Sequence, residues 1–344
     1  MAKPIFVLAD LNREYLQSLE IKLLETYKDR IDLEVIDDSQ YLEAFLSRTK
    51  RIDILIIAED LYRRFSLQGD IGIVYKLSEE NSPAPPDGTA VKTLFKYLNI
   101  QKIFGEIEYG ARQFVTAAKG QAEKTKIIVV YSALGGIGKT TIALGLCASL
   151  VNNHKKVLYV DAENLQDFSF YLSEKEALHS RASSVLSSGN DLFNGLRPYI
   201  RNEGFDYLPA LRMAASSMDV PLESFRQYVI ECKKHVEYDY IVIDTDSVFS
   251  EEKDELLQMA DRVVLIVQEG NYSKYKTDLL INNFASMDGK KYLAVCNKAS
   301  AQCNDRMEAF KGKVVDSVIH EMPGSVHLNT LRENREIEQL SYLL

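Results

Sequence analysis

Short apolar runs alternate with amphipathic segments along the first third of the chain. Apolar or β-branched runs at residues 5–9, 33–36, 52–57, 71–75 and 93–96 predict strands, and helical spacing of apolar residues predicts helices over 12–27, 41–48 and 98–117. Strands that alternate with helices predict a parallel sheet with helices on both faces. We therefore expect residues 1–117 to form an α/β domain.

Two polar segments interrupt this alternation. Residues 81–90, NSPAPPDGTA, carry three of the chain's eight prolines, so they are expected to form neither a helix nor a central strand. Residues 118–125 are polar and have no apolar period, which predicts a linker. A second domain is expected over residues 126–344.

The second domain repeats the strand-and-helix pattern. Apolar runs predict strands at residues 127–131, 156–160, 240–243, 262–267, 291–296 and 314–319, and a helix is expected over 139–151. The order predicts a doubly wound α/β fold with a mainly parallel sheet. The 344-residue length is consistent with two domains.

Composition and charge limit the possible partners and cellular location of the protein. The chain is 46% hydrophobic and 26% charged, with a formal net charge of -9. This acidity counts against binding to DNA and to anionic membranes. No apolar run reaches membrane-spanning length, the N-terminus lacks the order of a signal peptide, and the four cysteines form no CxxC pair. We expect a reduced, cytoplasmic protein.

The most informative motif is a glycine-rich turn between a strand and a helix. Residues 127–141 read IIVVYSALGGIGKTT, and this context is what a phosphate-binding loop requires. Glycines let backbone N–H groups approach phosphate oxygens, the lysine adds a charge, and the first threonine hydroxyl is placed to bind Mg²⁺. The predicted phosphate-binding residues are Leu134, Gly135, Gly136, Ile137, Gly138, Lys139, Thr140 and Thr141. Ala133 stands where the general pattern has glycine, which does not remove a donor.

The loop resembles that of the ParA/MinD branch of P-loop ATPases, which usually reads KGGxGKT. That resemblance implies an ATP- and Mg²⁺-dependent homodimer in which the first lysine of the loop reaches the partner's nucleotide. Leu134 occupies that lysine position. Because leucine carries no charge, the resemblance implies slow hydrolysis.

Acidic residues follow two further strands. Asp161 and Glu163 stand where the family usually has DxD, and the resemblance assigns them to positioning the attacking water. Asp244 resembles the acid of the Walker B strand, which with Thr140 holds Mg²⁺. Asp246 replaces a proline of the family pattern; the sequence leaves open whether it orients water or an ion or faces solvent.

Three residues near later strand ends resemble the base-reading part of the family. Asn297 and Lys298 follow the apolar run 294–296 and resemble its adenine-reading NK motif, while Pro323 matches a position that packs beside the base. An asparagine amide can both donate to and accept from an adenine edge.

Leu134 in place of the lysine, residues 183–200 followed by FDYLPA at 205–210, and the N-terminal segment are the features that carry a finer resemblance. By these the chain is most similar, within this branch, to the TadZ/CpaE group, whose members pair a receiver-like domain with an ATPase domain and serve Tad pilus assembly. Residues 1–117 resemble an atypical receiver, but Ala58 stands where the phosphate-accepting acid belongs. The resemblance implies a pseudo-receiver for interaction or dimerisation. It also implies pilus or secretion proteins as partners and a location at a cell pole.

Three alternatives remain. A ParA-like ATPase acting on DNA would need an exposed basic face, and a MinD-like membrane ATPase would need a basic terminal helix, whereas residues 326–344 carry Glu333, Glu336 and Glu338. A bacterial tyrosine kinase would need a terminal tyrosine cluster, and only Tyr342 lies near this end. The sequence does not identify the partner, the dimer surface or the rate.

Overall fold

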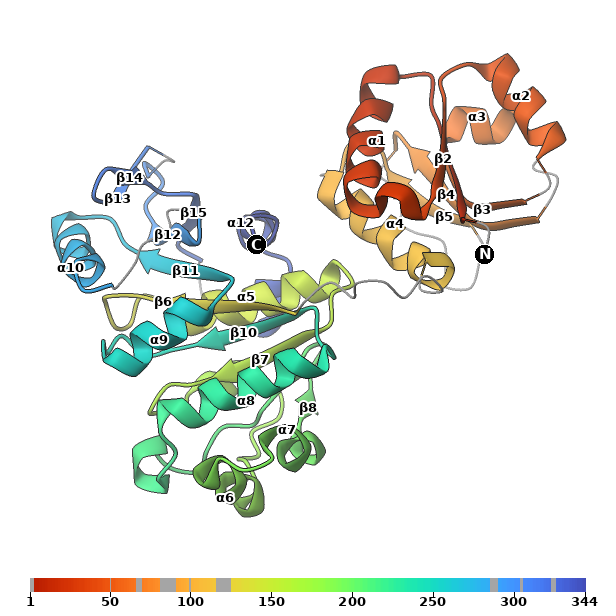
Figure 1. Cartoon of the computed structure of the whole chain (residues 1–344). Helices are drawn as coiled ribbons and strands as arrows, with labels where there is room; N and C mark the ends of the chain where they lie inside the picture. The colour runs from red at the N-terminus through yellow and green to blue at the C-terminus, as the bar shows by residue number, and fades with distance from the viewer. Residues whose placement is uncertain are drawn as a thin grey trace. The chain divides into compact units, whose positions relative to one another are not determined.

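The structure, a computed structural model, forms two compact units, Met1–Gln121 and Ala122–Leu344 (Figure 1). It describes residues 3–49, 51–65, 70–80, 91–98, 100–115, 125–284, 290–303, 306–322 and 326–344. The proline-rich residues 81–90, residues 118–124 of the predicted linker and Pro323 lie outside these ranges.

The first unit is a parallel sheet with helices on both faces. Its elements are β1 (Ile5–Ala9), α1 (Arg13–Tyr27), β2 (Asp32–Ile36), α2 (Ser39–Arg48), β3 (Arg51–Ala58), α3 (Glu59–Arg64), β4 (Asp70–Ser78), β5 (Val91–Phe95) and α4 (Ile100–Val115). The strand order is β2-β1-β3-β4-β5, and every pairing is parallel. Helices α1 and α4 cover one face, and α2 and α3 cover the other (Figure 1). This is the flavodoxin-like strand order.

Short polar side chains explain where the first helices begin. The Asn12 side chain accepts a hydrogen bond from the Tyr15 backbone N–H at 3.1 Å, and Asp38 accepts one from the Tyr41 N–H at 2.7 Å. Such N-caps satisfy backbone donors that have no partner within the helix. The turns before α1 and α2 are therefore set by local sequence.

The second unit is larger and also doubly wound. Its helices are α5 (Lys139–Asn152), α6 (Ser180–Ser188), α7 (Leu192–Leu196), α8 (Leu222–His235), α9 (Glu251–Met259), α10 (Asn271–Ile281), α11 (Leu328–Arg332) and α12 (Arg335–Ser341). Its strands are β6 (Lys126–Tyr131), β7 (Val157–Asp161), β8 (Arg201–Asn202), β9 (Asp206–Tyr207), β10 (Tyr240–Asp244), β11 (Arg262–Val267), β12 (Tyr292–Ala299), β13 (Glu308–Phe310), β14 (Lys313–Val314) and β15 (Ser317–His320). The α/β class with a mostly parallel sheet is thus confirmed.

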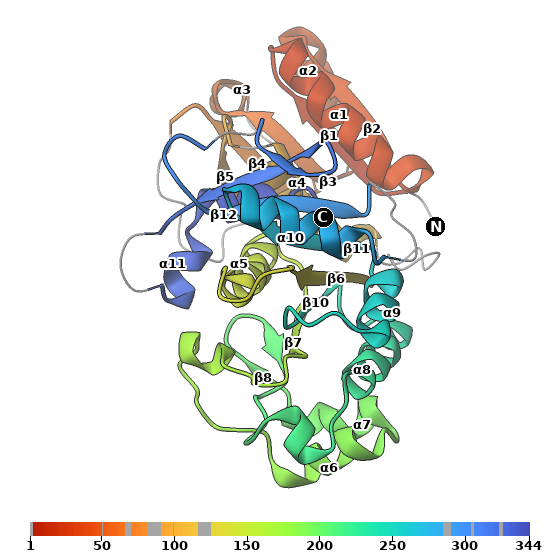
Figure 2. The ribbon, with the colours of Figure 1, turned by 90° about the vertical axis from the view of Figure 1, so that its left-hand side faces the viewer.

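Strand β6 lies in the middle of the second sheet. The order is β15-β12-β11-β6-β10-β7-β9-β8, and only β8 runs antiparallel to its described neighbour. Helices α5, α11 and α12 pack on one face, and α6 to α10 pack on the other; Figure 2 shows α5 opposite α8 and α9. Because β6 is flanked by β10 and β11, the loop after it opens at the centre of the sheet's carboxyl edge, where such folds bind ligands.

One predicted strand is wrong. The apolar run over residues 314–319 predicts a single strand, whereas the structure divides it into β14, paired with β13, and β15, paired with β12. Asp316 lies between them and exchanges hydrogen bonds with Ala294 through its backbone N–H and its carboxylate, both at 2.7 Å. The chain therefore leaves the hairpin and joins the main sheet at this residue. Asp316 and Ser317 are polar and interrupt the apolar residues at this point, and the prediction of a single strand passed over that break.

Among the described helices of both units, none is both long enough and apolar enough to cross a bilayer. The last helix, α12, buries Ile337 and Leu340 against the α5 side of the sheet. Its apolar face is therefore already occupied within the second unit.

Candidate functional site

The glycine-rich loop joins β6 to α5 at the centre of the sheet. Gly136 and Gly138 have φ angles of 71° and 91°, a region that L side chains rarely adopt. Gly138 is the N-cap of α5 and offers no side chain to the first-turn N–H groups. Free N–H groups at the positive end of a helix dipole are donors suited to an anion. Phosphate binding at this loop stays a prediction.

Lys139 is held at the loop by two contacts. Its side chain is buried, its Nζ lies 3.3 Å from the Glu163 carboxylate, and it donates to the Ser247 hydroxyl at 3.4 Å. Burial raises the pKa of Glu163, and the positive charge of Lys139 opposes that rise. The structure thus brings Lys139 and Glu163, which are far apart in the sequence, into one ion pair.

Asp161 and Asp244 lie opposite each other at the ends of β7 and β10. Both are buried, and one carboxylate oxygen of each has no hydrogen-bond partner among the described residues. Burial raises the pKa of Asp161, and burial with the nearby Glu163 raises the pKa of Asp244 to about 7. The Thr140 side chain opposes the rise of the Asp244 pKa, as does the Tyr159 hydroxyl, which donates to Asp244 at 3.2 Å.

This acid pair fits a Mg²⁺ ion bound together with phosphate. A buried carboxylate oxygen without a partner is stabilised by a cation, and Mg²⁺ is usually held by one or two carboxylates together with phosphate oxygens and water. Over the described ranges no cluster of three or more His, Cys, Asp or Glu residues could hold a metal by itself. The protein would supply Asp244 and the Thr140 hydroxyl, and nucleotide and water would supply the remaining ligands.

Asn297 and Lys298 contact the phosphate loop from β12. The Asn297 amide is buried and donates to the Ile137 carbonyl at 2.7 Å, and Lys298 Nζ donates to the Gly136 carbonyl at 2.9 Å. Both residues therefore fix the loop backbone in this structure. Reading of adenine by Asn297 stays a prediction, as does the packing of Pro323, which lies outside the described residues.

The remaining loop residues differ in orientation. Ile137 is buried in the core beside α5, and Leu134 packs against the same core while its carbonyl accepts from the Ser247 hydroxyl at 2.6 Å. Thr141 lies in the first turn of α5, and its hydroxyl is 3.3 Å from the hydroxyl of Tyr171. The Thr140 side chain instead interacts with Asp244, whose pKa it lowers.

Besides Ser247, the structure brings to the site a buried lysine that the sequence did not indicate. Lys253, in the first turn of α9, is 2% exposed, and its Nζ lies 3.1 Å from the Asp246 carboxylate and 5.5 Å from the Tyr131 ring centre. Burial lowers the pKa of Lys253, while the charge of Asp246 opposes this. Since its neighbours are Glu251, Glu252 and Asp254, the sequence pattern is typical of a solvated helix face.

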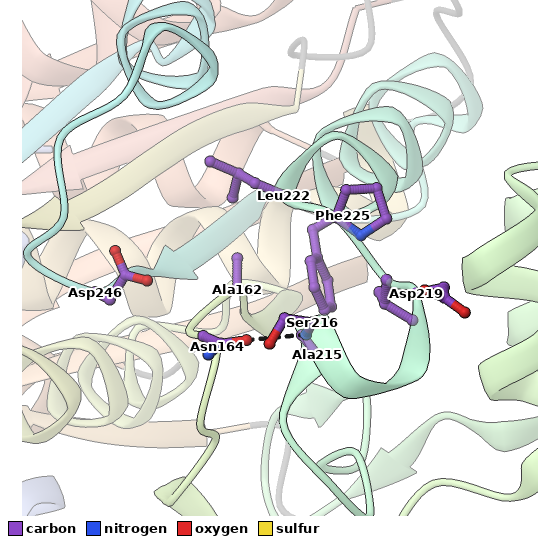
Figure 3. Close-up of a pocket in the computed structure, with 10 residues that line it drawn as sticks. Ala162, Asn164, Ala215, Ser216, Asp219, Leu222, Phe225 and Asp246 are labelled. Carbon is purple, nitrogen blue, oxygen red and sulfur yellow. Dashed lines mark hydrogen bonds between the residues drawn. The ribbon is translucent and has the colours of Figure 1, made fainter.

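A pocket of about 480 Å³ lies beside the loop that follows β7. It is lined by residues that follow β7 and β10, by the segment before α8 and by the first turn of α8, among them Ala162, Asn164, Phe225 and Asp246 (Figure 3). The Asn164 side chain accepts a hydrogen bond from the Ser216 N–H at 2.9 Å. Glu163 stands between the lining residues Ala162 and Asn164. The bond to Asn164 fixes this loop at the same pocket that Asp246 lines.

Comparisons with known proteins agree with this geometry. Residues 125–295 match the AAA_31 family model, described as an AAA domain. An uncharacterized ATP-binding protein of Methanocaldococcus jannaschii is 28% identical over 157 residues, which are 43% of this chain and 54% of that protein. The septum site-determining protein MinD of Thermotoga maritima is 26% identical over 176 residues, 46% of this chain and 64% of that protein.

A solved structure shows the same fold. The ParA family ATPase of Chlorobium tepidum aligns with a TM-score of 0.53 at 15% identity, covering 64% of this chain and all of that one. The chain spans between about half and two thirds of the length of the curated relatives named above. Fold and site define the second unit as a P-loop NTPase. The matches to MinD and to the family model support the ParA/MinD family within that class.

Proposed function

We propose that this chain binds ATP with Mg²⁺, dimerises on ATP and acts as a localisation or assembly factor for a Tad-type pilus or a related secretion machine. The observation that carries the nucleotide site is the meeting of Lys139, Thr140 and Asp244 at one glycine-rich loop. The phosphates would lie on the loop N–H groups and Lys139, and the cation on Thr140 and Asp244. Bound Mg²⁺ would neutralise phosphate charge.

Slow hydrolysis is part of the proposal. Leu134 packs against the core at the position where relatives have a lysine that acts across the dimer, and it brings no charge. Glu163, proposed to orient water with Asp161, is paired with Lys139 at 3.3 Å. The nucleotide would therefore act chiefly as a structural part of a dimer.

The first unit supports the assembly role. Its strand order is that of a receiver, and Ala58, at the end of β3, has no carboxylate to accept phosphate. Asp10 is paired with Lys96 at 2.7 Å, and both side chains are buried. We propose that this unit is a pseudo-receiver that binds partners or a second copy.

A positioning ATPase that acts on DNA or membrane is the second candidate. The family match supports a positioning role in general. The membrane version is less well supported, because α12 buries Ile337 and Leu340 and Glu336 is paired with His320 at 2.7 Å. The net charge of -9 counts against DNA.

The proposal is tested by light scattering of the full chain with and without ATP–Mg²⁺. We expect a monomer without nucleotide and a dimer with ATP, because a triphosphate tail would complete the charged face around the loop. ADP–Mg²⁺ serves as the control and should give less dimer. A chain that binds no adenine nucleotide would contradict the proposal, and a pull-down that recovered DNA but no secretion component would favour the second candidate.

Leu134→Lys is expected to raise the ATPase rate at least about fivefold. A charge supplied across a dimer can contribute on the order of 10³-fold or more to phosphoryl transfer. A lysine introduced at position 134 is expected to supply only part of this, because the surrounding residues are not arranged to position it. Steady-state phosphate release measures the change. Leu134→Met keeps the apolar contact without the charge and is the matched control; equal rates in both variants would assign the slow step elsewhere.

A further inference from the structure

Two buried lysines flank the phosphate loop, and each is paired with one acid. Lys139 begins α5 and lies 3.3 Å from Glu163, while Lys253, in the first turn of α9, lies 3.1 Å from Asp246. The exposed fractions of the two lysine side chains are only 8% and 3%. A lysine is rarely buried to this degree unless it is paired.

The two ion pairs lie within electrostatic range of each other. Lys139 also contacts the hydroxyl of Ser247, the residue that follows Asp246. Ala162 and Asn164, which flank Glu163, line the same pocket as Asp246 (Figure 3). Lys253 interacts electrostatically with Glu163 and with Lys139 as well as with Asp246. Lys139 thus contacts Glu163 directly, and the charge of Lys253 also interacts with it.

Nucleotide binding removes the resting partner of Glu163. A phosphate that takes Lys139 leaves the Glu163 carboxylate, which is only 18% exposed, beside a new negative charge. A buried charge without a partner is strongly unfavourable. Lys253 is the neighbouring cation that does not have to hold the phosphates, and its present partner Asp246 is 32% exposed and can be hydrated.

We propose that Lys253 is a positioning residue that pairs with Glu163 when nucleotide displaces Glu163 from Lys139. The exchange would hold Glu163 in the orientation that water activation needs, and it would release Asp246 and the segment 246–250. Val248 and Phe249 in this segment are 67% and 37% exposed, so the exchange would connect the phosphate site to an apolar surface. The inference rests on the proposed nucleotide site.

A double-mutant cycle on nucleotide affinity tests the exchange. With a non-hydrolysable ATP analogue and Mg²⁺, calorimetric titration should show Lys253→Met weakening affinity about 10-fold, within the coupling found between neighbouring charged groups. In a Glu163→Gln background the same change should cost less than about twofold, because no carboxylate then needs Lys253. Lys253→Arg keeps the charge and should restore most of the affinity.

Lys274→Met is the matched control. Lys274 is also in the first turn of a helix and is paired at 2.6 Å, but with Glu308 of β13, and its loss should leave the affinity unchanged. Equal losses for Lys253→Met in both backgrounds would overturn the exchange alone. Absence of binding by the unmodified chain would overturn the proposed function as well.

A second variant tests the exchange of partners between the two lysines if Lys253→Met does not fold. Asp246→Asn removes the resting partner of Lys253 and should tighten analogue binding about threefold, since Lys253 is then free for Glu163. In the Glu163→Gln background this gain should vanish. A gain of the same size in that background would mean that Asp246 acts only by its own charge, and would overturn the exchange.

Discussion

Lys139→Ala is expected to weaken ATP–Mg²⁺ binding by about 100-fold or more. The ammonium is buried at the start of α5 and is held within 3.4 Å of Ser247 and 3.3 Å of Glu163, so it is fixed beside the loop before nucleotide arrives. Truncating one partner of a buried, hydrogen-bonded charge pair costs roughly 2–5 kcal/mol, and about 2.7 kcal/mol already corresponds to 100-fold. Calorimetric titration of the full chain measures the loss.

The control must separate binding from stability. Lys139→Ala leaves Glu163 buried without its partner, so this variant should also melt at a lower temperature. Adding Glu163→Gln removes the unpaired charge and should restore much of the melting temperature without restoring nucleotide affinity. An unchanged affinity in folded Lys139→Ala would remove Lys139 from the site and, with it, the central assignment.

The sequence predicted the fold well where a buried strand reads as a continuous apolar run. The run at residues 5–9 is β1, and the run at 262–267 is β11, with the same ends. The alternation of such runs with helical periods predicted both doubly wound sheets. It failed at residues 314–319, where the polar Asp316 and Ser317 separate two pairs of apolar residues. Hydrogen bonds between Asp316 and Ala294 mark the point where the chain joins the main sheet.

The site was predictable where chain order alone places a residue. The loop after β6 and the acids after β7 and β10 had to meet, since parallel strands carry their carboxyl ends to one edge of the sheet. Asn297 shows the limit of this reasoning. Its position at the edge followed from the sequence, but its contact with the Ile137 carbonyl depends on the side-chain packing of a loop 160 residues away.

Lys253 could not have been found from sequence. It stands in an acidic helical turn after the N-cap Ser250, a setting in which lysine usually faces water. Its burial follows from how α9 packs beside the end of β6, where its ammonium lies 5.5 Å from the Tyr131 ring centre. Residues whose role comes from tertiary packing leave no periodic or motif pattern in the chain.

Gly138→Ala is expected to lower the free energy of unfolding of the second unit by about 2–5 kcal/mol. A left-handed conformation costs an L residue roughly 1–2 kcal/mol, and Gly138 has a φ of 91°. A Cβ at this position would also lie 2.4 Å from the amide nitrogen of Asn297. That side chain would have to move and lose its 2.7 Å bond to the Ile137 carbonyl, at a cost of roughly 1–3 kcal/mol. Thermal and urea unfolding of the nucleotide-free chain measure the change.

The loop contains its own graded controls. Gly135 has no left-handed φ, and a Cβ added to it would meet no atom within 4 Å, so Gly135→Ala should change stability by less than about 0.5 kcal/mol. Gly136 has a φ of 71° but open space, so Gly136→Ala should cost only the conformational part, roughly 1–2 kcal/mol. Equal effects at Gly136 and Gly138 would mean that Asn297 yields freely. The amide would then not be a fixed support of the phosphate loop, and it would be free to turn toward a bound base.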